Sequence, residues 1–229
     1  SLNPISETNT YKETFKVEGK LYDTNGVSKV KVSILNAKDN SEVVSWEKDG
    51  IDAKSQPTNN NLSEEITIGT NGKITSDGNY IIEVTVTDNV GKEVTERRSI
   101  TVDRKGPTVE FKSHEDGNII TTFPITVEGT ASDEGSGVNT EEGVFKLIQG
   151  STTVESGKLN IQANGIWNGS IVGKNLTEGE YELQVTIKDK AGYDDTSAVT
   201  VEYDKALPQL IVTEPSGNSV ITNGNVVIS

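Results

Sequence analysis

Apolar and polar residues alternate along short stretches of this chain, and turn-forming residues separate the stretches. From Tyr80 to Val86 every second residue is Tyr, Ile or Val, and Glu83 lies among the intervening positions. Side chains alternate between the two faces of a β-strand, so this stretch has one apolar face and one polar face. The order recurs from Tyr181 to Ile187. The pattern predicts strands buried on one face, which is typical of a two-sheet sandwich.

The same alternation predicts six strands in the first half of the chain and seven in the second, bounded mostly by Gly, Asn and Asp. No stretch has the 3.6-residue period and the capping residues of an amphipathic helix, so we expect almost no helix. The predicted strands are 13–21, 28–35, 42–47, 62–68, 78–87 and 94–102, then 108–112, 123–131, 143–149, 152–156, 166–172, 179–188 and 196–202.

The chain repeats itself. The pattern G-x-Y-x-x-x-V-x-[VI]-x-D-x-x-G covers residues 78–91 and recurs at 179–192, which is an offset of 101 that also relates the segments 103–107 and 204–208. An Asp three residues before a Gly suits a tight hairpin, because the carboxylate accepts backbone N–H groups and the Gly takes a positive φ. A repeat near this length is too long for a solenoid unit and suits an autonomous sandwich domain.

The front parts of the two repeats align at a different offset. Val-Glu-Gly occurs at 17–19 and at 127–129, which are 110 residues apart, so the first repeat contains the longer loops. We predict an all-β chain of tandem immunoglobulin-like β-sandwiches in an elongated arrangement: one domain at 1–106, a second at 107–206, and the truncated start of a third at 207–229.

The repeat unit resembles the bacterial immunoglobulin-like (Big-type) domains of surface adhesins, S-layer proteins and cell-wall hydrolases. The matching features are the 78–91 pattern with its copy, the junctions at 102–107 and 203–208, and Val-Glu-Gly followed by Asp133 and Gly137. The resemblance implies a bacterial cell-surface or secreted protein. It implies no single function, because that module serves as a spacer, an adhesin stalk and an enzyme accessory.

Composition excludes several classes of protein. The chain has no Cys, which excludes disulfides, thiolate metal sites and cysteine catalysis, and which favours a bacterial over a vertebrate surface protein. The net charge of −14 makes nucleic acid and anionic membranes poor partners. No apolar run is long enough to insert in a bilayer. Since the chain also lacks Met and a leader segment, we expect a piece of a longer precursor.

No catalytic centre is predicted. The single His is His114, in the turn Ser-His-Glu-Asp-Gly, and the matching turn at 214–217 contains none. A Ser/His/Asp centre would also need a positioned base and oxyanion donors. We therefore expect a non-enzymatic protein in which His114 belongs to a surface loop.

Trp46 and Trp167 occupy non-equivalent positions in the two repeats. An exposed Trp could stack on a sugar ring, whereas a Trp in a small sandwich more often fills the core. Their non-equivalence argues against a shared binding platform, so we expect core packing.

Calcium is the candidate ligand of this sequence. Hard cations need several oxygen ligands, and junctions between acidic tandem domains can supply them. Asp103 and Asp204 lie at the junctions, and Asp88 and Asp189 lie in hairpin turns. Some families similar to this one bind calcium at such junctions. Against a metal, the chain has no D-x-D-x-D-G loop and a basic residue follows each junction Asp, so the alternative is turn capping without any cofactor.

Two classes of function remain open. In the first, the chain is a structural spacer or stalk of a bacterial surface protein whose partners are the neighbouring repeats. In the second, it is a binding module, either an adhesin or a carbohydrate-binding accessory of a secreted enzyme, with a host or cell-wall protein or glycan as partner. The longer loops of the first repeat and Trp46 motivate the second class.

Overall fold

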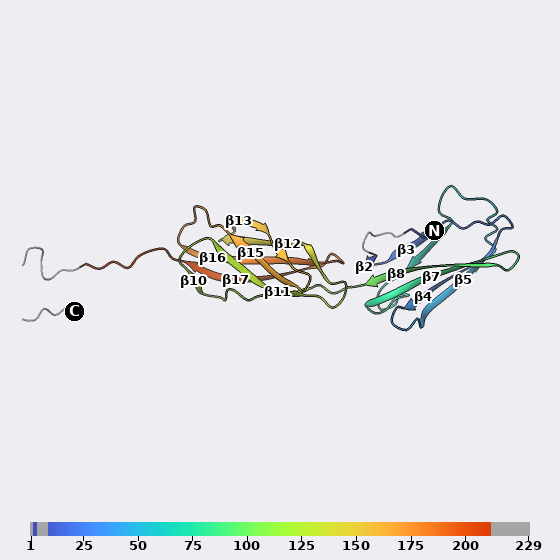
Figure 1. Cartoon of the computed structure of the whole chain (residues 1–229), viewed down its shortest axis with the longest axis horizontal. Helices are drawn as coiled ribbons and strands as arrows, with labels where there is room; N and C mark the ends of the chain where they lie inside the picture. The colour runs from blue at the N-terminus through green and yellow to red at the C-terminus, as the bar shows by residue number, and fades with distance from the viewer. Residues whose placement is uncertain (1, 4–8, 212–229) are drawn as a thin grey trace, which may run out of the picture.

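The computed structural model describes residues 2–3 and 9–211. These residues form strands β1 to β17 and no helix, so the predicted all-β fold is confirmed. It follows that the described residues contain no helix able to cross a membrane. The strands form two sandwiches that lie end to end along the long axis of the molecule (Figure 1).

The first sandwich packs a three-stranded sheet against a five-stranded sheet, in the orders β1-β3-β6 and β2-β8-β7-β4-β5. Neighbouring strands are antiparallel except β2 and β8, which are parallel. The strands are β1 (Leu2–Asn3), β2 (Thr10–Tyr11), β3 (Phe15–Gly19), β4 (Val27–Asn36), β5 (Glu42–Asp49), β6 (Leu62–Ile66), β7 (Gly78–Asp88) and β8 (Glu93–Val102).

The second sandwich has the same plan, with sheets in the orders β14-β15-β11-β9 and β10-β17-β16-β12-β13. Here β10 and β17 form the parallel pair. The strands are β9 (Thr108–Phe111), β10 (Asn118–Ile120), β11 (Ile125–Ser132), β12 (Val138–Gln149), β13 (Thr152–Lys158), β14 (Asn160–Ile161), β15 (Ile166–Ile171), β16 (Gly179–Asp189) and β17 (Asp194–Tyr203).

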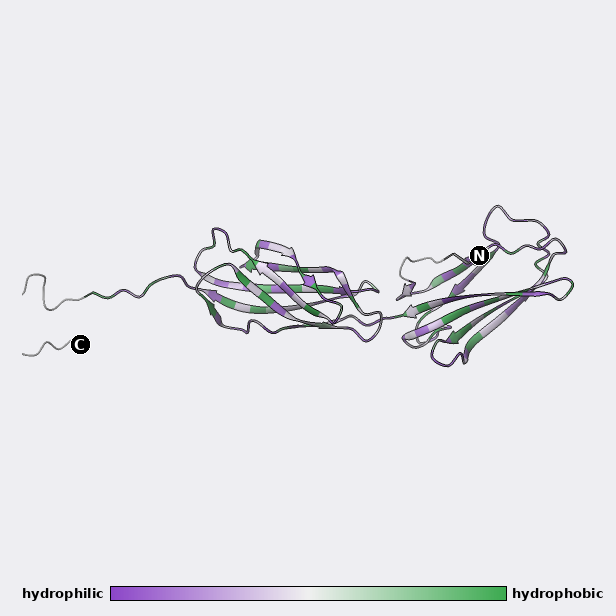
Figure 2. Cartoon of the chain, in the orientation of Figure 1, coloured by the Kyte–Doolittle hydropathy of each residue, from purple (hydrophilic) through white to green (hydrophobic). Residues whose placement is uncertain are grey.

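Each sandwich has its own hydrophobic core. The buried apolar residues of the first lie between Phe15 and Val102, and those of the second lie between Val109 and Val201. Apolar and polar residues alternate along the strands (Figure 2), and the apolar ones are buried, so each sheet turns its apolar face to the opposite sheet. Trp167 is completely buried in the second core, as predicted.

A tyrosine fixes the corner before the central strand in both sandwiches. The hydroxyl of Tyr80 donates to the carbonyl of Ser76, and that of Tyr181 donates to the carbonyl of Thr177, both at 2.8 Å. Tyr80 and Tyr181 begin the apolar ladder of β7 and β16, so the ring packs in the core while the hydroxyl closes the turn. This is the tyrosine corner found in immunoglobulin-like sandwiches.

The predicted Asp–Gly hairpins are confirmed. Gly91 and Gly192 have φ angles of 83° and 84°, a region that favours Gly. The Asp88 carboxylate accepts the N–H of Lys92 at 2.8 Å, and the Asp189 carboxylate accepts the N–H of Tyr193 at 2.9 Å. Each Asp thereby fixes the turn that joins the last two strands of its sandwich.

Four short strands were not predicted: β1, β2, β10 and β14, each of two or three residues. They are too short to display alternation, and they are defined only by pairing with a neighbouring strand, which for β2 and β10 is distant in sequence. β12 begins at Val138, whereas the predicted strand began at residue 143. The register shift between Val138 and Gly143 interrupts the alternation in the first part of this strand. The predicted start of a third domain lies, from residue 212 onward, outside the described residues.

Asp116 gives the second sandwich a testable dependence on pH. One carboxylate oxygen of Asp116 accepts both the N–H and the hydroxyl of Thr200, at 2.7 and 2.8 Å, and these bonds lower the pKa of Asp116 below 3.8. A carboxyl whose pKa is lowered on folding stabilises the fold at pH values above its pKa in the unfolded state. This stability is lost as the pH falls through its pKa in the folded state. We expect Asp116→Asn to lower the unfolding temperature at pH 7, with a difference from the wild type that shrinks below pH ~4. A difference independent of pH would contradict this.

Candidate metal centre at the domain junction

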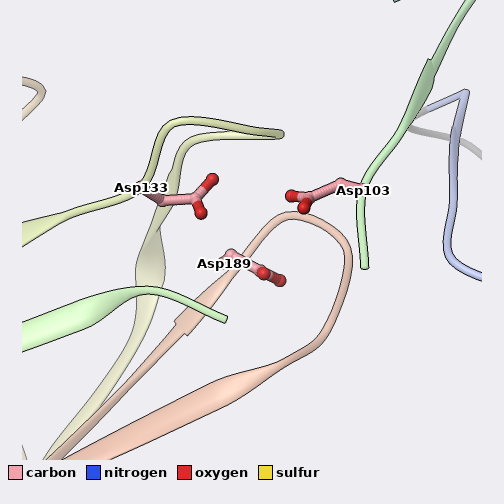
Figure 3. Close-up of side chains that lie close together, drawn as sticks. All are labelled: Asp103, Asp133 and Asp189. Atoms are coloured by element: carbon pink, nitrogen blue, oxygen red, sulfur yellow. The ribbon is translucent and has the colours of Figure 1, made fainter. Parts of the chain in front are cut away.

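Three aspartates from three separate elements meet where the two sandwiches join (Figure 3). Asp103 follows β8, Asp133 follows β11, and Asp189 ends β16. One carboxylate oxygen of each lies within 4.8 Å of the other two. Two oxygens bound to one Ca²⁺ at opposite sides are roughly 4.6–5.2 Å apart. The spacing therefore fits three ligands of a single calcium ion.

Asp103 is hydrogen-bonded to both sandwiches. Its backbone N–H donates to the carbonyl of Tyr11 in the first sandwich at 3.0 Å. One carboxylate oxygen accepts the N–H of Ser136 in the second sandwich at 2.7 Å, and the other accepts the N–H of Lys105 at 3.1 Å. Asp103 is 1% exposed. Because its carboxylate is buried by the neighbouring sandwich, the position of this side chain depends on both.

The other two carboxylates are also oriented by backbone donors. Asp133 accepts the N–H of Gly137 at 2.6 Å, and Asp189 accepts that of Tyr193. Asp189 is 1% exposed, and its second oxygen, Oδ2, is buried without a hydrogen-bond partner. Buried carboxylate oxygens are normally satisfied, so an unpartnered one beside two further carboxylates points to a cation as the missing partner.

The charges around Asp189 favour a cation. Burial raises the pKa of Asp189, and the nearby negative charges of Asp103 and Asp133 raise it further. No ion pair formed by the described residues includes any of the three aspartates. Like charges held together away from water are unfavourable unless a proton or a metal ion neutralises them.

The basic residue after Asp103 does not neutralise the cluster. Arg104 Nε donates to the carboxylate of Asp77 at 2.6 Å, and its guanidinium also donates to the carbonyl of Thr75 at 3.1 Å. Both partners belong to the first sandwich. The sequence argument against a metal, that a cation follows each junction Asp, therefore does not apply at Asp103.

The loop that carries Asp133 lies very close to Asp103. A Cβ at Gly135 would be 2.3 Å from the carboxylate carbon of Asp103, so only a glycine permits this approach. A junction cavity of about 400 Å³ adjoins the cluster and is lined by residues that include Asp103, Asp133 and Gly135. The cavity has room for the water molecules that would complete the coordination of a calcium ion.

A further contact crosses the junction beside the cluster. The ammonium of Lys12 lies 4.7 Å from the ring centroid of Tyr193, in cation–π geometry. Gly106 packs against Tyr193 as well, since a Cβ there would be 3.4 Å from the Cβ of Tyr193. Residues of the first sandwich and of the linker thus hold the hairpin that positions Asp189.

The structure brings two of the four predicted calcium candidates together. Asp103 and Asp189 join the cluster, whereas Asp88 and Asp204 do not, because each lies at the end of a sandwich that faces away from this junction. Asp133 was missed as a ligand. Its signal was available, because Asp133 belongs to the next-domain start that recurs between the repeats.

Trp46 is not a free platform for a sugar. The ring is half-buried against the first core, its Nε1 donates to Glu64 at 3.0 Å, and the ammonium of Lys73 lies 3.8 Å from the ring centroid. One face of the indole is therefore already in contact with a cation.

His114 contacts a serine without forming a relay. Its Nδ1 lies 2.8 Å from Ser113 Oγ, and that hydroxyl also accepts the N–H of Glu128 at 2.9 Å. Within residues 9–211 no carboxylate is hydrogen-bonded to the ring of His114. Partial burial lowers the pKa of His114. The hydroxyl serves to attach the turn to β11.

Known proteins with similar structures include bacterial adhesins. A tetra-tandem repeat from the extending region of a large adhesion protein is 19% identical, with a TM-score of 0.39 over 90% of this chain and 48% of that chain. A 1.5-MDa bacterial ice-binding adhesin is 16% identical, with a TM-score of 0.46 over 90% and 64%. A Ca²⁺-stabilized adhesin of an Antarctic bacterium is 21% identical, with a TM-score of 0.40 over 89% and 49%.

No family model and no curated protein matches the sequence. The chain spans between about half and just under two thirds of the three similar chains.

Proposed function

We propose that this chain is a non-enzymatic spacer of a bacterial cell-surface adhesin, in which calcium at the junction fixes successive sandwiches in line. The observation that carries the proposal is the cluster of Asp103, Asp133 and Asp189, the first and last of which are buried, with the unpartnered oxygen of Asp189. The partners of each sandwich are its neighbours in the chain, and the location is extracellular, where calcium is abundant.

Two physical properties support a role in spacing. The sandwiches have separate cores, so neither needs the other to bury its apolar residues. The link between them is short, runs from Asp103 to Pro107, and ends in a proline that restricts the backbone. Joints of this kind extend a chain, and a bound ion would reduce the remaining freedom at each joint.

Calcium suits the donor set better than other common ions. The ligands are carboxylate oxygens, which hard cations prefer, and the chain offers no Cys and no His near the cluster. The adjoining cavity allows the seven or so ligands that calcium takes, whereas magnesium demands a smaller octahedral shell. The ion would stabilise the joint by cancelling the repulsion among the three carboxylates.

Small-angle X-ray scattering in calcium and in EDTA tests the proposed rigid joint. We expect one extended shape in calcium, and a broader distribution of overall dimensions in EDTA because the carboxylates then repel each other. Asp103→Asn should give the broad distribution in both conditions.

Glu141→Gln removes one exposed carboxylate that does not belong to the cluster, so this control should respond as the wild type does. Equal distributions for the wild type in both conditions would contradict a calcium-fixed joint.

A further inference from the structure

The first sandwich is open on one side between its two sheets. β5 ends the five-stranded sheet and β6 ends the three-stranded sheet, and both strands line a cavity of about 320 Å³. The buried residues Leu21, Val30 and Leu62 form the apolar part of its lining, and Lys48 and Glu64 belong to the polar part. We call this cavity the seam.

The second sandwich shows what the fold places at the seam when no cavity is kept. The offset of 101 aligns β7 with β16, and the offset of 110 aligns β3 with β11. The pairing partners of these strands then give the equivalent residues of β5 and β6. Trp46 corresponds to Gly157, Lys48 to Leu159, and Glu64 to Gly169.

Apolar side chains close this side of the second sandwich. Leu159 and Ile161 are buried there, and β14 packs against both β12 and β15. A Cβ at Gly169 would be 2.9 Å from the side chain of Leu159, so the glycine makes room for the leucine. The same side of the fold therefore forms part of the core in one sandwich and a cavity in the other.

The first sandwich has two charged residues in place of this apolar filling. Lys48 is paired with Val30, and Glu64 is paired with Val17. Both valines are buried, and paired residues lie on the same face of a sheet, so Lys48 and Glu64 belong to the inner faces. A charge turned inward can protect a sheet edge from pairing, but that role requires neither a cavity nor charges of both signs.

Lys48 and Glu64 both keep hydrogen-bonding capacity for a ligand. Trp46 Nε1 donates to Glu64 Oε2 at 3.0 Å, which orients the carboxylate, while Glu64 Oε1 has no partner among the described residues. Within residues 9–211 the ammonium of Lys48 forms no ion pair and no hydrogen bond. The two opposite charges thus line one cavity without meeting each other.

The loop between β5 and β6 leaves the seam open. This loop, residues 50–61, is longer than its counterpart at 159–165, yet it supplies no strand like β14. The N–H groups of Gly50 and Asp52 donate to backbone carbonyls at the start of β4, at 2.9 and 3.0 Å. These bonds hold the first part of the loop beside β4, so the loop borders the seam without filling it.

We propose that the seam binds one pyranose ring of a neutral sugar. Hydroxyl groups both donate and accept, so neighbouring hydroxyls of one ring can donate to Glu64 and accept from Lys48. The C–H face of the ring would lie on Val30 and Leu62. The volume is at the lower end of the range of about 300–1,000 Å³ for small-molecule sites, which suits a single ring. A ligand of one charge would meet a like charge in the seam.

This binding site goes beyond the proposed spacer function. All residues that line the seam belong to the first sandwich, and none of them belongs to the aspartate cluster at the junction. Sugar binding is therefore expected to be the same in calcium and in EDTA.

The two tryptophans allow NMR to test the site in the whole chain. The indole N–H of Trp46 is bonded to Glu64, so its signal should move when a sugar binds. The indole N–H of Trp167 is buried in the other sandwich, so its signal should stay in place. Titration with D-glucose, D-galactose, D-mannose and N-acetyl-D-glucosamine should give a saturable shift of the Trp46 signal with at least one of these sugars.

Lys48→Leu introduces the residue that closes the second sandwich. We expect this variant to fold with an unfolding temperature at or above that of the wild type, and to bind the sugar at least about tenfold more weakly. Glu64→Gln removes a charge-assisted hydrogen bond and should also weaken binding by about tenfold. The control is Glu65→Gln, an exposed neighbour on the other face of β6, which should bind as the wild type does.

Three results would overturn the sugar site. The first is a Trp46 signal that none of the four sugars moves, and the second is a shift that persists unchanged in Lys48→Leu. The third is a shift produced by the free amino acid glycine and by none of the sugars, which would make the seam a site for a zwitterion. Each of these results would leave the calcium response of the junction, and with it the proposed spacer function, unaffected.

Discussion

Calcium should raise the unfolding temperature of this chain at pH 7.5, and Asp189→Asn should abolish most of that increase. A ligand present at about a hundred times its dissociation constant stabilises the folded state by about 2.7 kcal/mol. For a chain of this size the shift is on the order of 10 °C. Differential scanning calorimetry in calcium and in EDTA measures it. Magnesium should raise the unfolding temperature by less than calcium does, since the junction does not impose the octahedral coordination that magnesium requires.

In EDTA the wild type should no longer be more stable than Asp189→Asn. The wild type then holds three carboxylates together with no counter-ion, whereas Asp189→Asn removes one buried charge from the cluster. We therefore expect Asp189→Asn to unfold at the same temperature as the wild type or above it in EDTA, and below it in calcium. Glu141→Gln serves as the control and should keep the full calcium response. A calcium response of Asp189→Asn equal to that of the wild type would place the ion elsewhere.

Trp167→Ala should destabilise the second sandwich by about 3–5 kcal/mol and leave the first intact. Trp167 is completely buried, its ring meets Phe111 edge-on at 5.3 Å, and it lies over Gly129, where a Cβ would be 2.2 Å from the ring. Removing it leaves a large cavity. Calorimetry should show one transition lowered by more than 10 °C and the other unchanged.

Trp46→Ala is the matched comparison because Trp46 is only half-buried, in the other sandwich. It should affect the first sandwich, and by less. Trp167→Phe keeps most of the volume and removes the indole N–H, which has no partner in the core, so its cost should be well below that of Trp167→Ala. If both transitions fell together in Trp167→Ala, the two sandwiches would not be independent.

The sequence allowed the strands to be predicted because alternation is a local property. Tyr80, Ile82 and Val84 share a face whatever lies opposite, and the structure buries all three. Short edge strands such as β10 could not be predicted, because β10 exists only through its pairing with β17, about 80 residues later. The bonds of the two tyrosine corners were missed for a related reason, since the hydroxyl partner depends on the bend of the preceding loop.

Two of the three aspartates of the candidate site were predicted from the sequence. Asp103 and Asp189 stand in a junction and a hairpin that the repeat makes visible, so both were selected. Asp133 also stands in a recurring segment, but choosing it as a ligand required knowing that the loop after β11 packs against the end of the first sandwich, a contact that depends on Gly135. The direction of Arg104, toward Asp77, likewise follows from the folded geometry alone.

The parallel pairs β2–β8 and β10–β17 determine how the molecule responds to pulling. In each sandwich a strand near the start of the domain runs alongside the last strand, with Asn118 opposite Val201 and Ile120 opposite Tyr203 in the second. Tension applied through the two ends slides these strands past each other along their length. The bonds between them stretch together under shear and do not open one by one, so each unit should withstand a pulling force along its length far better than its small core suggests.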